Sequence, residues 1–357
     1  MKTLFIGSYG FGNLGDELCL IEAIKSFPSK EIWVRTIFPE HTSKMIACDG
    51  FIKWSPPRPQ NNYKIDFERV VYGGGFLYKD LVYWIMAAQN SGAQTYIHNV
   101  GIKNNLFSWA DEKIKKSFEK LDGISVRDSY SKEILLSLGI KKEIKITSFP
   151  EKEIEKDLSL ANSLPNNCSI LGITIDNRGH IFSNILLNPN KKRIKKKINT
   201  IIEELPKPVK ILPVISKVHI FSDCENDIKY FYKFYDQFLR GFEIVLPEIL
   251  NKKWWFNHLT PQKLKGLISK CKVLISTSKH NCLHALSCGI KTIGICFEET
   301  KKYMEGFFHP FNDSLENNKN EIFLVYGKHK KQCKDNFFKV ILFKINKIWI
   351  KQSLKIL

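Results

Sequence analysis

The sequence predicts an α/β protein with two domains, each built on a parallel sheet, followed by a basic amphipathic helix. Three observations predict this. Short β-rich segments alternate with helical ones along most of the 357 residues, a pattern typical of parallel sheets covered by helices on both faces. A stretch of weak pattern, SLANSLPNNC at 159–168, divides the segments into two series. The C-terminal tail is rich in lysine and has helical periodicity.

The first series predicts an N-terminal domain over residues 1–158. A helix is expected from Asp16 to about Phe27, between the first two strands. The expected strands are TLFIGSY (3–9), EIWVRTIF (31–38), FERVVYGGG (67–75), TYIHNVGI (95–102), GISVRD (123–128) and EIKITS (143–148).

The second series predicts a C-terminal domain over residues 169–310, after the linker at 159–168. Two similar α/β domains are expected to face each other across a cleft, where ligands usually bind. The expected strands are SILGITID (169–176), VKILPVIS (209–216), FEIVLPE (242–248), VLISTS (273–278) and KTIGICF (291–297).

The tail at 328–357 predicts a basic amphipathic helix. It carries nine lysines and one acid, Asp335. Two interpretations stay open: a helix lying on an anionic membrane surface, or a terminal helix packed on the body with solvated lysines. The apolar face consists of Phe338, Ile341, Leu342, Ile345 and Trp349.

The net charge of +19 does not by itself indicate a nucleic-acid-binding protein. In the basic run KKRIKKK at 191–197, isoleucines recur at helical spacing from Ile194 to Ile202. The lysines there are therefore expected on the wet face of an amphipathic helix. Anionic substrates or anionic lipid account for the charge equally well, and no nucleic-acid partner is expected.

The cysteines and the N-terminus predict a cytoplasmic protein. Nine cysteines without a C-x-x-C pair are typical of thiols in a reducing compartment. No stretch of eighteen apolar residues or signal peptide is recognised. Peripheral contact of the basic tail with the inner face of the cytoplasmic membrane stays open as an alternative.

The stretch GFGNLG at 10–15 has the form G-x-G-x-x-G, but a dinucleotide site is not expected. Such a site needs an acid at the end of the second strand, where this sequence offers Arg35 and Glu40. Asp16 and Glu17 follow directly and would repel a pyrophosphate. Asp16 is instead expected to be a helix cap or a polar residue of a site.

Three motifs in the first domain together resemble the polysaccharide pyruvyl transferase family. They are GSYGFGNLGDE (7–17), VVYGGGFLYKD (70–80) and SVRDSYSKEILLSLGI (125–140), in the family's order. The segment 267–303 resembles the family's C-terminal signature, in which a strand precedes an R-x-H motif, a helix, a glycine and a further strand.

This resemblance, which covers roughly residues 3–305, implies two Rossmann-like domains arranged as in GT-B glycosyltransferases. It also implies transfer of a pyruvyl group from phosphoenolpyruvate to a sugar as a ketal, with no further cofactor. The implied acceptor is a saccharide or a lipid-linked saccharide of a surface polysaccharide. Residues of the matching motifs then line the site: Gly12, Asn13, Asp16, Arg127 and Asp128.

Two positions depart from the family pattern. When Gly289 is placed on the family glycine, His280 falls on the family histidine and Ser278 on the family arginine, with Lys279 between them. Lysine supplies a positive charge but cannot donate the bidentate pair of hydrogen bonds that a guanidinium gives to a carboxylate. After the sixth strand, TSFPE (147–151) stands where the family often has an aspartate. Both departures bear on pyruvyl transfer and not on the fold.

Ketal formation from phosphoenolpyruvate requires an acid that protonates the methylene carbon and cations that hold the carboxylate and the phosphate. His280 is the candidate acid, because it follows a strand at the expected carboxyl edge of the sheet. No metal is expected, since His284 one turn later has no third ligand beside it. The anion-binding candidates are Lys279, Lys301, Arg178 and the amides of Gly73, Gly74 and Gly75.

Pyruvyl transfer is therefore the function that the sequence favours, and two alternatives stay open. A GT-B glycosyltransferase would keep the fold and use Lys279 and Lys301 to bind the diphosphate of a nucleotide sugar. A diverged sugar- or anion-binding protein would keep the ligand site without catalysis, which the serine at position 278 favours.

Overall fold

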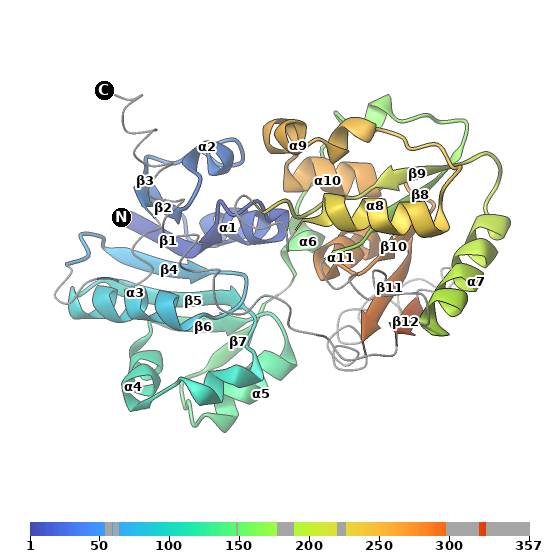
Figure 1. The fold of residues 1–357 in the computed structure, drawn as a ribbon. Coiled ribbons are helices and arrows are strands. Elements are labelled where there is room, and N and C mark those ends of the chain that lie inside the picture. Colours follow the sequence, from blue (N-terminus) through green and yellow to red (C-terminus); the bar gives the residue numbers. More distant parts are fainter. Residues whose placement is uncertain are drawn as a thin grey trace. The chain divides into compact units, whose positions relative to one another are not determined.

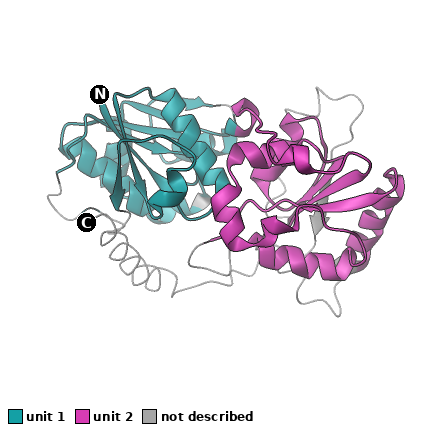
Figure 2. Ribbon diagram, turned by 90° about the horizontal axis from the view of Figure 1, so that it is seen from above, with its two compact units in different colours: residues 1–150, 336–357 teal, residues 151–335 magenta. Residues whose placement is uncertain are grey.

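The computed structural model describes residues 1–53, 59, 64–147, 149–176, 189–219, 226–297 and 321–325. The described chain divides into two compact units, with the first ending at Pro150 and the second beginning at Glu151 (Figure 2). Each unit contains one parallel sheet (Figure 1). The predicted α/β class with parallel sheets is thus confirmed.

The sheet of unit 1 has seven strands in the order β3-β2-β1-β4-β5-β6-β7, all parallel. Six of them confirm predicted strands. The short edge strand β3 was not predicted, since GFIK has too few residues to show alternation. The bounds are β1 Lys2–Tyr9, β2 Glu31–Thr36, β3 Gly50–Lys53, β4 Arg69–Gly73, β5 Gln94–Val100, β6 Gly123–Val126 and β7 Ile144–Ile146.

Helices connect these strands, α6 follows the last strand and leads into unit 2, and polar residues cap several helices. Asn13, Asp111 and Asp128 each accept a hydrogen bond from a backbone amide in the first turn of the helix that follows, as short polar side chains do at N-caps. The bounds are α1 Leu14–Ser26, α2 Pro39–Thr42, α3 Lys79–Asn90, η1 Asn104–Ser108, α4 Glu112–Lys120, α5 Ser129–Ser137 and α6 Pro150–Glu153.

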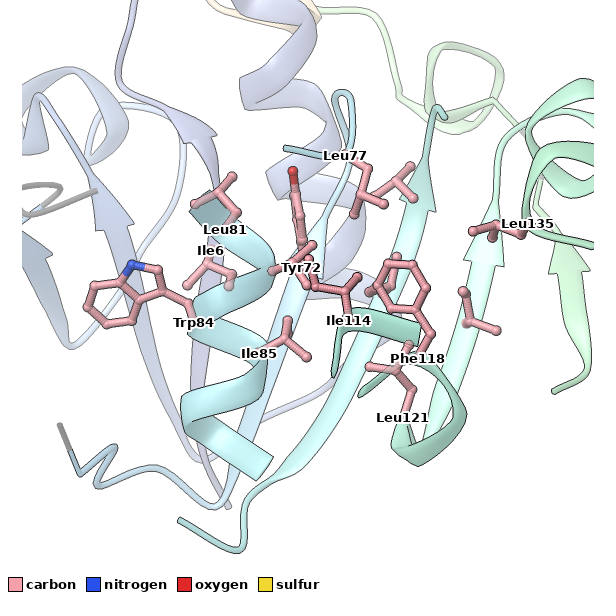
Figure 3. Packing of buried hydrophobic residues seen from close by; sticks show 14 of the residues in the cluster. Ile6, Tyr72, Leu77, Leu81, Trp84, Ile85, Ile114, Phe118, Leu121 and Leu135 are labelled. Atoms are coloured by element: carbon pink, nitrogen blue, oxygen red, sulfur yellow. The ribbon is translucent and has the colours of Figure 1, made fainter. Parts of the chain in front are cut away.

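Strand β1 is buried on both faces, so its alternate side chains enter two apolar clusters. Phe5 and Tyr9 pack with residues of α1 and β4. Leu4 and Ile6 belong to a larger cluster on the other face, where side chains of α3 and α4 point toward the sheet (Figure 3). This cluster includes Tyr72, Leu81, Trp84, Ile85, Ile114, Phe118 and Leu135.

The sheet of unit 2 has five parallel strands in the order β12-β11-β10-β8-β9. The strands are β8 Ser169–Thr174, β9 Val209–Pro213, β10 Val273–Ser276, β11 Lys291–Phe297 and β12 Glu321–Val325. The helices are η2 Ala161–Ser163, α7 Pro189–Glu204, α8 Asp227–Phe238, η5 Pro247–Leu250, α9 Lys252–His258, α10 Pro261–Ile268 and α11 Lys279–Ser287.

Helix α7 confirms the amphipathic interpretation of the basic run. Ile194, Ile198 and Ile201 are buried, whereas Lys192 and Lys195 are exposed. Lys192 and Lys195 are therefore solvated, as the helical spacing of the isoleucines predicts.

The prediction of a strand at 242–248 was wrong. Only one bridge forms there, between Ile244 and Ile211. Leu246 has φ +53, in the left-handed region that ends an extended strand, and Pro247 begins η5. The segment is thus bent away from the sheet after one pair of hydrogen bonds. Strand β12, in contrast, was not predicted.

The division between the units falls before the predicted limit at residue 158, because the chain from Glu151 is tied to α10. Lys265 Nζ donates hydrogen bonds to the carbonyl oxygens of Glu151 and Ile154, at 2.8 and 2.7 Å. Asp157 N donates to Gln262 O at 3.0 Å. Within the predicted linker at 159–168, a turn of η2 forms and Leu164 is buried.

The predicted helix at 328–357 lies outside the described residues. None of the helices in the described ranges has the length and apolar character needed to cross a membrane.

A substitution at Gly74, the residue after β4, would test how closely α1 packs on this strand end. Gly74 has φ +66, and a Cβ there would overlap Cys19 of α1. Gly139 also has a positive φ, +89, but no atom lies within 4 Å of its Cβ position. Gly139→Ala therefore introduces backbone strain of about 1–2 kcal/mol, whereas Gly74→Ala adds overpacking of about 1–3 kcal/mol.

We expect Gly74→Ala to lower the free energy of unfolding by at least about 1 kcal/mol more than Gly139→Ala, as measured by urea denaturation with tryptophan fluorescence. Equal losses in the two variants would contradict the packing of α1 against the glycine strand end.

Candidate functional site

The carboxyl edge of the sheet in unit 2 collects polar side chains from three neighbouring strands. Asp176 follows β8, Ser216 follows β9, and residues 277–278 join β10 to the start of α11. Because parallel strands end at the same edge, these segments lie together, which is where α/β proteins bind ligands.

The turn after β10 is held by its own serines. Ser276 Oγ accepts a hydrogen bond from Ser278 N and donates one to Ser278 O, both at 2.9 Å. Ser278 occupies the N-cap position of α11. Lys279 and His280 thus stand in the first turn of the helix, with Lys279 7% exposed.

His280 has a buried carboxylate as its partner. Its Nδ1 is hydrogen-bonded to Oε1 of Glu151, which lies in α6 and whose side chain is 1% exposed. The side chain of His280 is 21% exposed. A ligand can therefore reach the imidazole but not the carboxylate.

Glu151 is ionised in the folded protein. Burial by itself raises the pKa of this carboxyl, but His280, His284 and Lys279 outweigh burial and lower the pKa to about 2. In His284, burial dominates and lowers the pKa to about 3. His284 is therefore neutral near pH 7.

Two further acids lie at the same edge. Thr277 Oγ1 donates a hydrogen bond to Asp176 Oδ1 at 2.9 Å. Asp227 accepts from the amides of Ser216 and Lys217, at 3.0 and 2.9 Å. Burial and then the charge of Asp176 raise the pKa of Asp227 to about 7. This edge therefore contains carboxyl groups as well as cations.

In unit 1, the opening motif forms a tight turn closed by side chains. Asn13, not Asp16, caps α1: its Oδ1 accepts from Gly15 N at 3.1 Å. Asn13 Nδ2 donates to Asp16 Oδ2 at 2.8 Å. Gly10 and Gly12 have φ +78 and +81, which explains why this turn needs glycine.

The triple glycine after β4 packs closely against α1. Gly73 and Gly74 lie against Ala23 and Cys19, respectively. The amide of Gly74 donates to His98 O at 2.8 Å, so that donor is already used inside the protein. Asp16 Oδ1 lies 3.1 Å from the Cβ position of Gly75. The opening motif and the glycine strand end thus meet at one edge.

Arg127 and Asp128 lie at the carboxyl edge of the same sheet. Asp128 caps α5 by accepting from Ser131 N at 2.7 Å. The guanidinium of Arg127 lies 4.4 Å from the ring centroid of Phe76 and packs on Gly101. Both residues therefore have a structural role, and Arg127 is 4% exposed.

The structure thus brings Ser278, Lys279 and His280 together in unit 2, and Asn13, Asp16 and Gly75 together in unit 1. Lys301 and Arg178 lie outside the described residues. Sequence reasoning missed Glu151, Asp176 and Asp227. The only signal for Glu151 was the departure from the family pattern at TSFPE.

The fold of the chain is that of the GT-B-like α/β proteins with two Rossmann-like units. UDP-GlcNAc 2-epimerase from Methanocaldococcus jannaschii has a TM-score of 0.52 at 11% identity, over 90% of this chain and 94% of that one. The enzyme from Neisseria meningitidis, bound to UDP-GlcNAc, has 0.52 at 13% identity, over 90% and 95%. At these identities the likeness concerns the fold alone.

The sequence model of the polysaccharide pyruvyl transferases matches residues 13–295. The chain therefore belongs to the polysaccharide pyruvyl transferase family, which confirms the resemblance of its motifs. No curated protein has a sequence that matches the chain significantly.

The buried carboxyl of Glu17 in the opening motif should make the stability of the protein depend on pH. Its Oε1 accepts from Gly10 N at 2.5 Å, and burial raises its pKa to about 8, from the ordinary 4.5. A carboxyl whose pKa is raised in the folded state favours folding at low pH, and this contribution is lost as the pH rises from 4.5 to 8.

Glu17→Gln imitates the neutral carboxyl and removes this dependence. We expect the melting temperature of E17Q, relative to the unmodified protein, to increase steadily from pH 5 to pH 8. Glu31→Gln, at an exposed position, is the control and should show a constant difference. A constant difference for E17Q as well would mean that Glu17 is ionised in the folded protein.

Proposed function

We propose that this protein transfers a pyruvyl group from phosphoenolpyruvate to a pair of sugar hydroxyls, forming a ketal and releasing phosphate. Membership of the polysaccharide pyruvyl transferase family supports this. The observation that carries the proposal is His280, a partly accessible imidazole backed by a buried, ionised carboxylate at the carboxyl edge of the second sheet.

The chemistry needs one proton donor at the reacting carbon. His280 protonates the methylene carbon of phosphoenolpyruvate, and the adjacent carbon becomes cationic. One sugar hydroxyl adds there, phosphate leaves, and the second hydroxyl completes the ketal. Of the two hydroxyl protons, one replaces the proton that His280 gave and the other leaves with phosphate. General acid catalysis of this kind contributes about 10²–10⁴-fold.

Lys279 supplies positive charge at the first turn of α11, where helix amides also favour anions. In this proposal it binds the carboxylate or the phosphate of the donor in place of the family arginine, whose position Ser278 occupies. The donor is itself the source of the transferred group, so the proposal includes no further cofactor. A saccharide of a surface polysaccharide is the proposed acceptor.

A second candidate, a glycosyltransferase that uses a nucleotide sugar, is favoured by the two acids at the same edge. Asp176 and Asp227 lie beside the turn that would bind phosphoenolpyruvate. Negative charge on these carboxyl groups would repel the carboxylate and the phosphate of that small donor. The sugar ring of a nucleotide sugar has hydroxyls that can donate hydrogen bonds to Asp176, which is half-buried, whereas Asp227 is 1% exposed and acts through its charge. The third candidate, a binding protein without turnover, is favoured by Ser278.

His280→Asn tests the proposed acid. The assay offers phosphoenolpyruvate and a panel of aryl glycosides that differ in their pairs of neighbouring hydroxyls, and it follows inorganic phosphate and the new ketal methyl group by NMR. We expect kcat to fall about 10²-fold or more in H280N, because the proton donor is lost. His258→Asn, at an exposed histidine of α9, is the control and should leave kcat unchanged.

The outcome also separates the candidates. A ligand at about 100 times its Kd stabilises a protein by about 2.7 kcal/mol, so binding is visible as a raised melting temperature. Stabilisation by UDP- or GDP-sugars and not by phosphoenolpyruvate would contradict pyruvyl transfer and support the glycosyltransferase. Binding of phosphoenolpyruvate without turnover on any glycoside, and without an effect of H280N, would support the binding protein.

A further inference from the structure

We propose that Glu151 is a positioning residue that keeps a proton on Nδ1 of His280 and thereby makes Nε2 the reacting nitrogen. The two ring nitrogens of histidine are chemically distinct, and the partner of one decides what the other can do. Three features support this role: the hydrogen bond between the two side chains, the contacts that fix Glu151, and the charged groups that face it. It deepens the proposed function but applies to any reaction in which His280 moves a proton.

The tautomer follows from the hydrogen bond. Glu151 Oε1 contacts Nδ1 of His280, and an ionised carboxylate has lone pairs only. If Nδ1 carried no proton, two acceptors would face each other. The proton therefore resides on Nδ1 whether the ring is neutral or charged. Nε2 is left to accept a proton in the neutral ring and to donate one in the charged ring.

The backbone of Glu151 is held by side chains from two helices. Lys265 of α10 donates from Nζ to the carbonyl of Glu151 at 2.8 Å. Ser287 Oγ, at the end of α11, donates to the same carbonyl at 3.2 Å. Helix α11 is thus joined to Glu151 at both ends, by His280 through the carboxylate and by Ser287 through the backbone. A residue fixed in this way can orient a ring that is itself partly exposed.

Among the groups around Glu151, His280 is the one whose ring the carboxylate orients for contact with a ligand. Lys279 and His284 face it from α11, and Lys265 lies near it from α10. His284 is fully buried and neutral, since burial lowers its pKa to about 3. Between His280 and His284, His280 is the one that is hydrogen-bonded to the carboxylate and accessible from outside.

The consequence for proton transfer is direct. The charged ring gives the Nε2 proton to the methylene carbon of the donor and becomes neutral, with its remaining proton on Nδ1. Nε2 then takes the proton of a sugar hydroxyl, which restores the charged ring. The Nδ1 proton stays between the ring and Glu151 throughout, so the carboxylate acts without touching the substrate.

Glu151→Gln is the test, because glutamine keeps the shape and removes the charge. Glu153→Gln is the matched control, since Glu153 is an exposed residue of the same helix α6. The first measurement is the pattern of ring-nitrogen to ring-proton correlations of His280 by NMR, assigned by its absence in H280N. We expect Nδ1–H alone in the neutral ring of the unmodified protein and E153Q, and a share of Nε2–H in E151Q.

The second measurement is the division of any turnover into kcat and KM. We expect kcat to fall at least about tenfold in E151Q, which corresponds to about 1.4 kcal/mol in the barrier, with KM changed less than about threefold, since Glu151 does not touch substrate. In serine proteases, the carboxylate that orients the catalytic histidine contributes up to about 10⁴. E153Q should match the unmodified protein in both values.

The NMR measurement on the unmodified protein needs no variant, so a misfolded E151Q would not leave the proposal untested. An Nε2–H tautomer in that protein overturns it, as does an E151Q variant with unchanged tautomer and kcat. If no glycoside is pyruvylated but the tautomer follows Glu151, the proposed function fails and the positioning role stands. If pyruvylation occurs with the Nε2–H tautomer, the reverse is true.

Discussion

The pairing of buried Glu151 with His280 is the interaction on which the edge of the second sheet depends. Glu151 is 1% exposed, and a buried acceptor that loses its hydrogen-bond partner costs about 1–3 kcal/mol or more, because its charge is left away from water. The pair therefore fixes the start of α11, and with it the turn that presents Lys279. The backbone of Glu151 is bound by Lys265 as well, so α6, α10 and α11 form one connected support.

The two units use buried glutamates in opposite charge states. Glu17 and Glu151 are both 1% exposed, yet the pKa of Glu17 is raised to about 8 and that of Glu151 lowered to about 2. Burial raises the pKa in both. The difference arises from the partner, since Gly10 offers Glu17 one amide, whereas His280, His284 and Lys279 surround Glu151. At pH 7, Glu17 in unit 1 is therefore mostly neutral, whereas Glu151 in unit 2 is ionised.

Much of the fold could be predicted from periodicity, and the exceptions have local causes. Strands buried on both faces, such as β1 and β4, show continuous apolar runs, and the isoleucines of α7 show helical spacing. The segment 242–248 has the composition of a strand, but the backbone turns at Leu246, where φ is +53. The glycines after β4 were candidates for anion binding, and the structure shows that two of them allow α1 to pack closely.

The sequence by itself determined the class of fold and the grouping of Ser278, Lys279 and His280, since consecutive residues after a parallel strand must lie at its carboxyl edge. Tertiary structure alone decided the partner of His280. Glu151 lies 129 residues away in the chain, and periodicity describes only neighbours along a helix or strand. The charge state of a buried carboxyl likewise depends on groups that only folding brings together, so no local pattern of the chain could predict it.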